Sequence, residues 1–408
     1  MILYTIITLP LVYAWALTAL ALILALITVL WFMRPMITVG NHHAPEEQPP
    51  FDKAPKVSVI VCTGSREEEL INHLDALTQQ DYPDYEIIVV CDTTSESSEI
   101  LAESCAHRYG NVYVTFIPPG SHNLSRRKLA LTLGMKAAKG DVVVTTVSTA
   151  TIPSAQWLSA LTAPFRGPRR KDIEISLGYS HQDYAQMKGL NRWYREFDSL
   201  MTDSRWLGYA LAHDPYRGDG FNLAISKDLF FRHKGYSRSI GLQAGDDDIF
   251  IHEVATPQNT EAVLSPDSIL RIEWGDASSR IWKARKEQYD FTSHWLPQTP
   301  FTLAGAFSAM QWIIPALCVA AAVIAYIFRF DDFAADHSLM LELLAVIPVA
   351  LLVYGGFLLA ETLIYRRCAS RMQATRLWWA LPWFMLLRPL NNIIFRLFHR
   401  GSQNSTMI

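Results

Sequence analysis

The sequence predicts an α/β protein in which a mostly parallel, doubly wound sheet is flanked by transmembrane helices at both ends of the chain. From Lys56 onward, apolar β-branched runs alternate with segments of helical spacing, which is typical of parallel βαβ units. Long uncharged apolar runs lie near both termini, and each is long enough to cross a bilayer. Only 18% of the 408 residues are charged, whereas soluble domains usually have about a quarter.

The N-terminal apolar run has no charged residue from Ile2 to Phe32, and Arg34 follows it. A spanning helix needs about 20 apolar residues, and the run lacks the cleavage pattern of a signal peptide. We therefore expect residues 1–34 to form an uncleaved anchor and residues 35–55 to form a linker.

Two further apolar runs, 301–328 and 339–365, lie in the C-terminal membrane region, residues 296–400. Arginines follow the second run at Arg366, Arg367, Arg371 and Arg376. Because arginine-rich flanks stay cytoplasmic, this cluster and Arg34 predict a cytoplasmic central domain. The turn at residues 329–337 is then expected on the outer side.

A fourth apolar stretch, residues 377–398, is interrupted by Pro382 and by Arg388-Pro389. Arginine is costly at mid-bilayer, and proline breaks the helical hydrogen-bond ladder. We expect an interfacial or re-entrant segment, with a full fourth span as the alternative, and a short tail at residues 401–408.

The central domain, residues 56–295, contains the predicted sheet. Strands are expected over residues 57–61, 85–90, 112–117 and 142–147, and helices over residues 67–77, 100–108 and 128–138. Ligands of such sheets bind beyond the carboxyl ends of the strands. Those positions hold Thr63, Asp92 and Ser148-Thr149-Ala150. Asp92 is the carboxylate among them, and it either forms an Asx-turn or contacts a ligand.

Two polar motifs follow farther along the chain. Residues 218–224 form a glycine-flanked turn that includes Gly220 and Asn222. Three consecutive aspartates, Asp246 to Asp248, then precede an apolar helical segment. One or two aspartates suffice to cap a helix, so the third suggests a catalytic base or a cation ligand, and both interpretations stay open.

Composition excludes some classes of function. The net charge is −3, so no basic field indicates nucleic acid as a partner. The five cysteines are scattered without a CxxC pair, which argues against a disulfide framework and a thiolate zinc site.

Several segments occur together in a recognisable order: Val57 to Glu69, Ile87 to Asp92, Ser125-Arg126-Arg127-Lys128, Gly218 to Ala224 and Asp246-Asp247. In this order and spacing, residues 55–290 resemble a family 2 glycosyltransferase of the membrane-bound branch. The resemblance implies the GT-A nucleotide-diphosphosugar transferase fold, whose Rossmann-like sheet is mostly parallel.

The resemblance also implies roles for individual residues. Donor binding would fall on Asp92, Thr63, Lys128, Arg126, Ser148 and Ala150. The acceptor side would include Asn222 and Gly220, and Asp247 would be the catalytic base, with Asp246 and Asp248 tuning it.

The chain departs from the family pattern in two places. The cation-binding Asp-x-Asp is replaced by Ser148-Thr149-Ala150, and these residues would hold Mg²⁺ or Mn²⁺ poorly because such cations prefer charged oxygen ligands. The C-terminal Gln/Arg-rich segment, here 282–288, keeps basic residues but loses the order. The cluster Arg280, Lys283, Arg285 and Lys286 would bind either the donor diphosphate or anionic lipid.

These features predict a multi-pass enzyme of the inner cell membrane. It would transfer a sugar, with inversion, from a nucleotide sugar, expected to be a UDP-sugar, to a lipid-linked or polysaccharide acceptor. The alternative is a catalytically degenerate GT-A scaffold that binds a nucleotide sugar or a partner enzyme in envelope glycan assembly.

Overall fold

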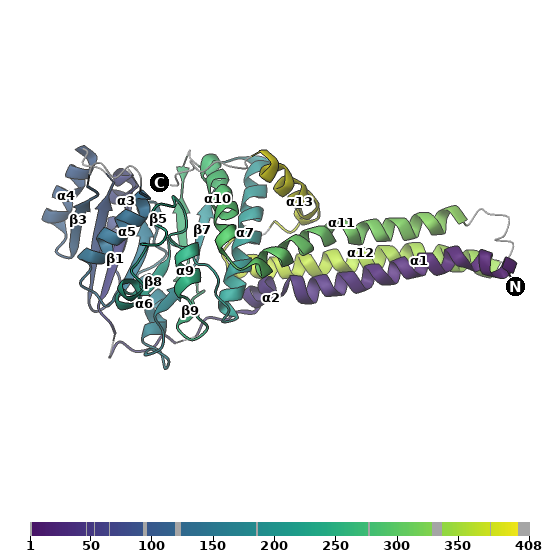
Figure 1. Cartoon of the computed structure of the whole chain (residues 1–408), viewed down its shortest axis with the longest axis horizontal. Helices are drawn as coiled ribbons and strands as arrows, with labels where there is room; N and C mark the ends of the chain where they lie inside the picture. The colour runs from purple at the N-terminus through teal and green to yellow at the C-terminus, as the bar shows by residue number, and fades with distance from the viewer. Residues whose placement is uncertain are drawn as a thin grey trace. The chain divides into compact units, whose positions relative to one another are not determined.

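The computed structural model describes residues 2–45, 47–52, 54–64, 66–92, 96–118, 124–184, 187–275, 278–328, 337–375 and 377–398. The chain forms two compact units (Figure 1). The first comprises Met1–Ile37, Thr299–Arg367 and Leu377–Phe398, and the main part of the second is Thr38–Gln298. The predicted tail and nearly all of the predicted turn at 329–337 lie outside the described residues.

The second unit is built around a seven-stranded sheet with the strand order β3-β2-β1-β4-β8-β6-β9. Its strands are, in chain order, β1 (Val57–Cys62), β2 (Tyr85–Cys91), β3 (Val112–Phe116), β4 (Val142–Val147), β6 (Ile175–Leu177), β8 (Leu223–Ser226) and β9 (Thr260–Ala262). β1 pairs in parallel with β2 and β4, placing Val59 opposite Ile87 and Val144. β8 runs antiparallel to both of its neighbours. The predicted mostly parallel sheet is confirmed.

Helices cover both faces of this sheet (Figure 1). They are α3 (Glu67–Thr78), α4 (Glu96–Arg108), α5 (Arg126–Ala137), α6 (Trp157–Thr162), η2 (Ala163–Phe165), α7 (Gly189–Leu211), α8 (Lys227–Arg232) and α9 (Asp248–Val254). In β1, Val57, Val59 and Val61 pack with α3, α4 and α6, whereas Ile60 and Cys62 pack with α5, α8 and α9. Because successive side chains of a strand point to opposite faces, a strand that is buried on both faces carries apolar residues on each of them.

A smaller sheet has the strand order β5-β10-β7. Its strands are β5 (Ala150–Thr151), β7 (Ser180–Asp183) and β10 (Leu270–Glu273), and the helices that follow it are α10 (Ser278–Thr292) and η4 (Ser293–Trp295). β10 pairs antiparallel with β5 and parallel with β7. The N–H of Glu273 also donates to the carbonyl of Thr149 at 3.0 Å. The sheet therefore brings the residues that follow β4 beside the end of β10.

Long apolar helices form most of the first unit. The helices of this part of the chain are α1 (Ile2–Ile27), η1 (Thr28–Phe32), α2 (Arg34–Asn41), α11 (Gln298–Phe328), α12 (His337–Arg371) and α13 (Leu381–Phe398). Among the described residues, three segments are long and apolar enough to cross a membrane: Leu9–Phe32, Gln298–Phe328 and Leu341–Arg371. These match the three predicted spans, and α13 is not among them.

The three long apolar helices pack through small residues. Ala14, Ala21 and Ala25 of α1 are buried against α11 and α12, and small side chains let helices approach closely in a membrane. Within this packing, Nε2 of Gln311 on α11 donates to the buried carboxyl of Glu361 on α12 at 2.5 Å. This hydrogen bond links α11 to α12 at these two positions.

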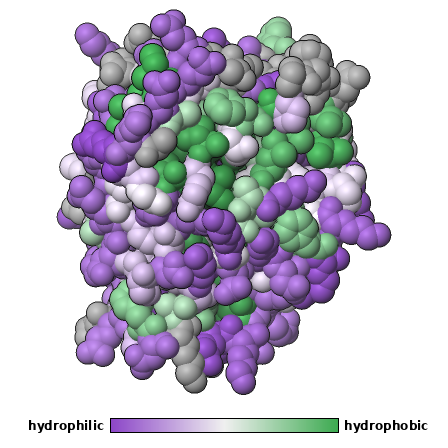
Figure 2. Space-filling model, turned by 90° about the vertical axis from the view of Figure 1, so that its left-hand side faces the viewer, coloured by the Kyte–Doolittle hydropathy of each residue, from purple (hydrophilic) through white to green (hydrophobic). Residues whose placement is uncertain are grey.

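The surfaces of the two units differ in character. Figure 2 shows a face of the second unit that is mostly hydrophilic, with hydrophobic side chains gathered in its upper half. The candidate spans instead expose large apolar side chains, such as Leu30 at 69% and Leu352 at 74%. Apolar surface of this kind is typical of segments that can cross a bilayer.

Candidate active site

A large pocket lies beyond the carboxyl ends of β1, β4 and β10, where open parallel sheets bind their ligands. Its volume is about 980 Å³, at the upper end of the range of about 300–1,000 Å³ for small-molecule sites. We call it the larger pocket. The residues that line it include Arg66, Glu69, Thr149, Trp274, Arg280 and Lys283.

Two aromatic rings connect the larger pocket to a smaller one. Trp274 lines the larger pocket, and its indole N–H donates to Oε1 of Gln182 at 2.7 Å. Its ring meets the edge of Phe221, with the centroids 6.0 Å apart. Phe221 lines a pocket of about 30 Å³ that also contains Asp246 and Asp247. We call this second cavity the smaller pocket, and the two cavities are neighbours across the two rings.

Of the three positions of the lost Asp-x-Asp, Thr149 lines the larger pocket, and none of the three has a charged side chain. Oγ of Ser148 donates to the carbonyl of Thr63 at 3.0 Å, and Ala150 has no polar side-chain atom. Oγ1 of Thr149 is buried and has no hydrogen-bond partner among the described residues. Ser148 and Thr63, both predicted to bind the donor, are therefore hydrogen-bonded to each other. Of the three positions 148–150, only Thr149 has a hydroxyl without a partner among the described residues.

The remaining carboxylates of the larger pocket do not compensate for this loss. Glu69 lies 3.8 Å from Arg66 in an ion pair, and Glu273 accepts a hydrogen bond from Thr151 at 2.8 Å. Among the described residues, no group of three or more His, Cys, Asp or Glu side chains could hold a metal ion. Because Mg²⁺ and Mn²⁺ select several oxygen ligands with charge, the described residues of the larger pocket do not fit such a cation.

Asp92 and Arg126, both predicted to bind the donor, form an ion pair with each other. Nε of Arg126 lies 3.2 Å from Oδ2 of Asp92, and its guanidinium also donates to the Asp92 carbonyl. Neither residue lines the larger pocket. The neighbouring segments 93–95 and 119–123 lie outside the described residues. The role of Asp92 and Arg126 in donor binding therefore stays a prediction.

Two of the three aspartates in the acidic triplet form ion pairs with arginines. Nε of Arg127 donates to Asp246 at 2.6 Å. Arg217 binds Asp248 through two hydrogen bonds of 2.8 and 2.7 Å. In the described part of the chain, Asp247 has no ion pair, and it is the member of the triplet that is only partly buried. The triplet thus presents one uncompensated carboxylate to the smaller pocket.

The environment of Asp247 favours a proton on it. Its Oδ1 accepts the N–H of Asp248 at 2.8 Å, and its Oδ2 accepts the N–H of Gly220 at 3.3 Å. Crowding by protein atoms, and then the charges of Asp248 and Asp246, raise the pKa of Asp247 well above its usual range. A carboxyl with a raised pKa is a stronger base when ionised.

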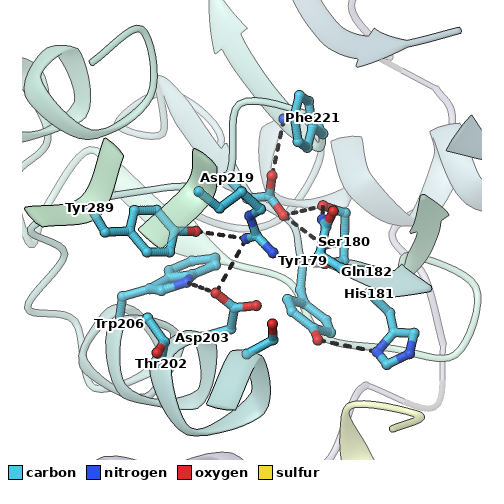
Figure 3. Close-up of polar contacts among 12 residues, drawn as sticks. Tyr179, Ser180, His181, Gln182, Thr202, Asp203, Trp206, Asp219, Phe221 and Tyr289 are labelled. Carbon is cyan, nitrogen blue, oxygen red and sulfur yellow. Dashed lines mark hydrogen bonds and ion pairs between the residues drawn. The ribbon is translucent and has the colours of Figure 1, made fainter. Parts of the chain in front are cut away.

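Asp219 fixes the turn that faces Asp247. Its Oδ2 accepts the N–H of Ser180 at 2.7 Å and also the Ser180 hydroxyl, and its Oδ1 accepts the N–H of Phe221 at 3.1 Å (Figure 3). A carboxylate that accepts several donors is held rigidly. The turn predicted at 218–224 is therefore tied to β7.

Arg285 and Lys286 are engaged with buried acids on α7. Arg285 lies 3.5 Å from Asp203, and it donates to the hydroxyl of Tyr289 at 2.6 Å. Lys286 donates to Asp198 at 2.9 Å. Asp203 and Tyr289 lie within the network of Figure 3. Arg285 lines the smaller pocket, and neither basic residue lines the larger one.

Lys128, predicted to bind the donor, has a different place. Its ammonium is buried and donates to the carbonyls of Ser239, Leu242 and Ala244 at 2.7, 3.1 and 2.7 Å. A lysine has three N–H donors, so all of them are used. This arrangement does not support the predicted contact with the donor, because Lys128 instead holds the loop that leads into the acidic triplet.

Asn222 is likewise part of the framework rather than of an open acceptor surface. Its amide donates to the carbonyls of Tyr179 and Ser268 at 2.8 and 2.7 Å, and it accepts the indole N–H of Trp157 at 3.1 Å. Gly220, in contrast, contacts the candidate base Asp247. Its N–H reaches Asp247, as above, and its carbonyl accepts Thr145 and Arg127, each at 2.9 Å.

Reasoning from the sequence missed several residues of the site. Arg66 and Trp274 line the larger pocket, and Arg127, Arg217 and Asp219 arrange the smaller one. Arg127 and Asp219 lie inside motifs that had been recognised, so their signal was present. Arg217 carries no such signal in the sequence, because a single arginine does not show which residue it will contact in the folded protein.

Comparison with known proteins places this fold in a class. Residues 55–220 match the family model described as glycosyltransferase like family 2. A mannosyltransferase from Pyrobaculum calidifontis is 18% identical, covers 96% of this chain and 100% of its own, and has a TM-score of 0.50. The S. aureus protein TarS is 15% identical, covers 85% of this chain and 90% of its own, with a TM-score of 0.39. The comparison with curated protein sequences finds no match.

The mostly parallel sheet and its likeness to the mannosyltransferase show the GT-A fold. The match of residues 55–220 to the family model supports a family 2-like glycosyltransferase domain in this part of the chain. The resemblance inferred from the sequence motifs is confirmed.

Proposed function

We propose that this enzyme binds a nucleotide sugar in the larger pocket and transfers the sugar, with inversion, to a membrane-associated acceptor. The observation that carries the proposal is the position of Asp247. Of three adjacent carboxylates it alone lacks a cationic partner among the described residues, and it lines the smaller pocket beside the larger one. We assign it as the catalytic base.

The reaction follows from this arrangement. The acceptor hydroxyl attacks the anomeric carbon, and its proton passes to a carboxylate oxygen of Asp247. The bond from the anomeric carbon to the diphosphate oxygen breaks, and its electron pair leaves with the nucleoside diphosphate. The transition state resembles an oxocarbenium ion. Attack opposite the leaving group inverts the anomeric configuration.

The nucleotide sugar is the donor class that fits the larger pocket by size and place. The Pyrobaculum calidifontis mannosyltransferase was solved with GDP-mannose and Mn²⁺, and the family resemblance leads us to expect a UDP-sugar. Donors with both bases are therefore the ones to test.

The membrane helices support a membrane-associated acceptor. Three segments can span a bilayer, and the arginines at Arg34, Arg366 and Arg367 favour a cytoplasmic catalytic domain. We propose an inner-membrane enzyme with residues 56–295 as the cytoplasmic domain. A lipid-linked or polysaccharide acceptor would meet such a domain near the bilayer.

The test uses the full chain in detergent, mixed with membranes of its own source as the supply of acceptors. UDP- and GDP-sugars are added in turn, and release of the nucleoside diphosphate is measured. The product linkage is then determined by NMR. We expect one donor to turn over with inversion. A retained configuration would overturn the assigned mechanism, and a lack of turnover with every donor would favour the non-catalytic scaffold.

A further inference from the structure

We propose that Arg66, Arg280 and Lys283 bind and neutralise the donor diphosphate in place of a divalent cation. This inference rests on the proposed function and specifies how its donor site works. The three cations line the larger pocket together with Thr149, the central position of the lost Asp-x-Asp. Positive charge therefore lies where the family pattern places metal-binding carboxylates.

The local framework explains how these cations meet. Arg66 follows β1, and the side chains of Arg280 and Lys283 belong to α10. A separation of three residues puts two helical side chains on the same face. The antiparallel pairing of β10 with β5, together with the hydrogen bond from the N–H of Glu273 to the carbonyl of Thr149, places the end of β10 beside Thr149. Two distant segments thus deliver cations to one cavity.

The ion pairs of Arg66 and Lys283 leave both cations available, and Arg66 also lies over the ring of Trp274, 5.4 Å from its centroid. Arg66 lies 3.8 Å from Glu69, and Lys283 lies 3.9 Å from Glu287. Both separations exceed hydrogen-bond distance, and such partly exposed ion pairs contribute little. A phosphate oxygen can therefore replace either carboxylate at small cost.

Thr149 supplies an independent observation. Its hydroxyl is buried, lines the larger pocket and has no partner among the described residues. Buried hydroxyls are normally hydrogen-bonded. A phosphate oxygen of a bound nucleotide would accept this donor, whereas a metal ion would gain a single uncharged ligand.

The chemistry needs this positive charge at the moment of bond cleavage. When the glycosidic bond of the donor breaks, negative charge develops on the departing diphosphate. Arginine binds phosphate through paired N–H donors, and lysine acts as a compact point charge. Both stabilise the leaving group as a cation would. Lys128, Arg285 and Lys286, in contrast, are committed to protein partners.

The experiment measures nucleotide binding by the full chain in detergent. Binding of radiolabelled UDP and GDP is determined by equilibrium dialysis, once with excess EDTA and once with Mn²⁺. The variants Arg66→Gln, Arg280→Gln and Lys283→Gln are compared with Lys136→Gln, which removes the same charge from an exposed site on α5. Uridine and guanosine serve as probes that lack the diphosphate.

We expect one diphosphate to bind with the same affinity in EDTA and in Mn²⁺. Each pocket variant should weaken it about tenfold, the loss of one charge-assisted contact. Nucleoside binding and the Lys136→Gln variant should stay unchanged. A tenfold or greater loss in EDTA would overturn the inference while leaving the glycosyltransferase proposal intact. Binding of neither diphosphate in either condition would remove the donor assignment and the inference together.

Discussion

Replacing Asp247 by asparagine separates catalysis from stability. Asparagine keeps the shape of the side chain and one oxygen, which can still accept the N–H of Asp248. It loses the ability to take a proton from the acceptor hydroxyl. Removal of a general base costs about 100- to 10,000-fold in turnover, and we expect a loss in that range.

The effect on stability should be small at neutral pH. The substitution gives up the 3.3 Å hydrogen bond from the N–H of Gly220, which is worth about 1 kcal/mol or less. It also removes repulsion from Asp246 and Asp248, which acts in the opposite direction. We therefore expect the free energy of unfolding to change by no more than about 1 kcal/mol.

The pH dependence of that change has a definite sign. A carboxyl whose pKa is raised in the folded state contributes stability at low pH, and this contribution is lost as the pH rises through the folded pKa. Asp247 has such a raised pKa. Relative to wild type, the Tm of Asp247→Asn should therefore rise as the pH is increased from about 5 to 8.

The assay combines two measurements on the same preparations. Release of the nucleoside diphosphate gives the activity, and thermal unfolding followed by tryptophan fluorescence gives the stability. Asp172→Asn, an exposed aspartate of the same domain, is the matched control. Activity of Asp247→Asn within tenfold of wild type would refute the assignment of the base. A Tm difference that fell with rising pH would refute the electrostatic reasoning.

Three further predictions concern the framework. Arg217→Leu leaves the buried charge of Asp248 unpaired and should lower the free energy of unfolding in urea by about 3–5 kcal/mol, whereas an unchanged midpoint would contradict this. At Gly134 an added Cβ would lie 2.7 Å from Ile60, so Gly134→Ala should cost about 1–3 kcal/mol in the same assay, and Ile60→Val should restore part of the loss. Trp157→Phe leaves the carbonyl oxygen of the Asn222 amide without its indole donor; the expected cost is about 1–3 kcal/mol, and a Tm equal to wild type would count against it.

The fold could be predicted because its determinants are local. The valines of β1 at positions 57, 59 and 61 are apolar on one face, and Ile60 supplies the other. A run of this kind already specifies a strand buried on both sides. The helices that could span a membrane were predictable for the same reason, since length and composition identify them.

The site was less predictable because its chemistry depends on tertiary partners. Lys128 and Arg66 are both basic residues near predicted loops, but one is enclosed by carbonyls and the other lines the larger pocket. The sequence distinguished Asp247 from Asp246 only through the family resemblance. The structure separates them physically, because Arg127 compensates one and leaves the other free of a cationic partner among the described residues.

The ammonium of Lys128 resembles an ion held in a cage of carbonyl oxygens. Unlike a dissolved ion, it is covalently attached to the chain, so a chelator cannot extract it and a change of metal supply cannot alter it. Burial lowers the pKa of Lys128 to about 8, so the proton is what this cation can lose. The order of the loop before the acidic triplet should therefore respond to alkaline pH rather than to the metal content of the solution.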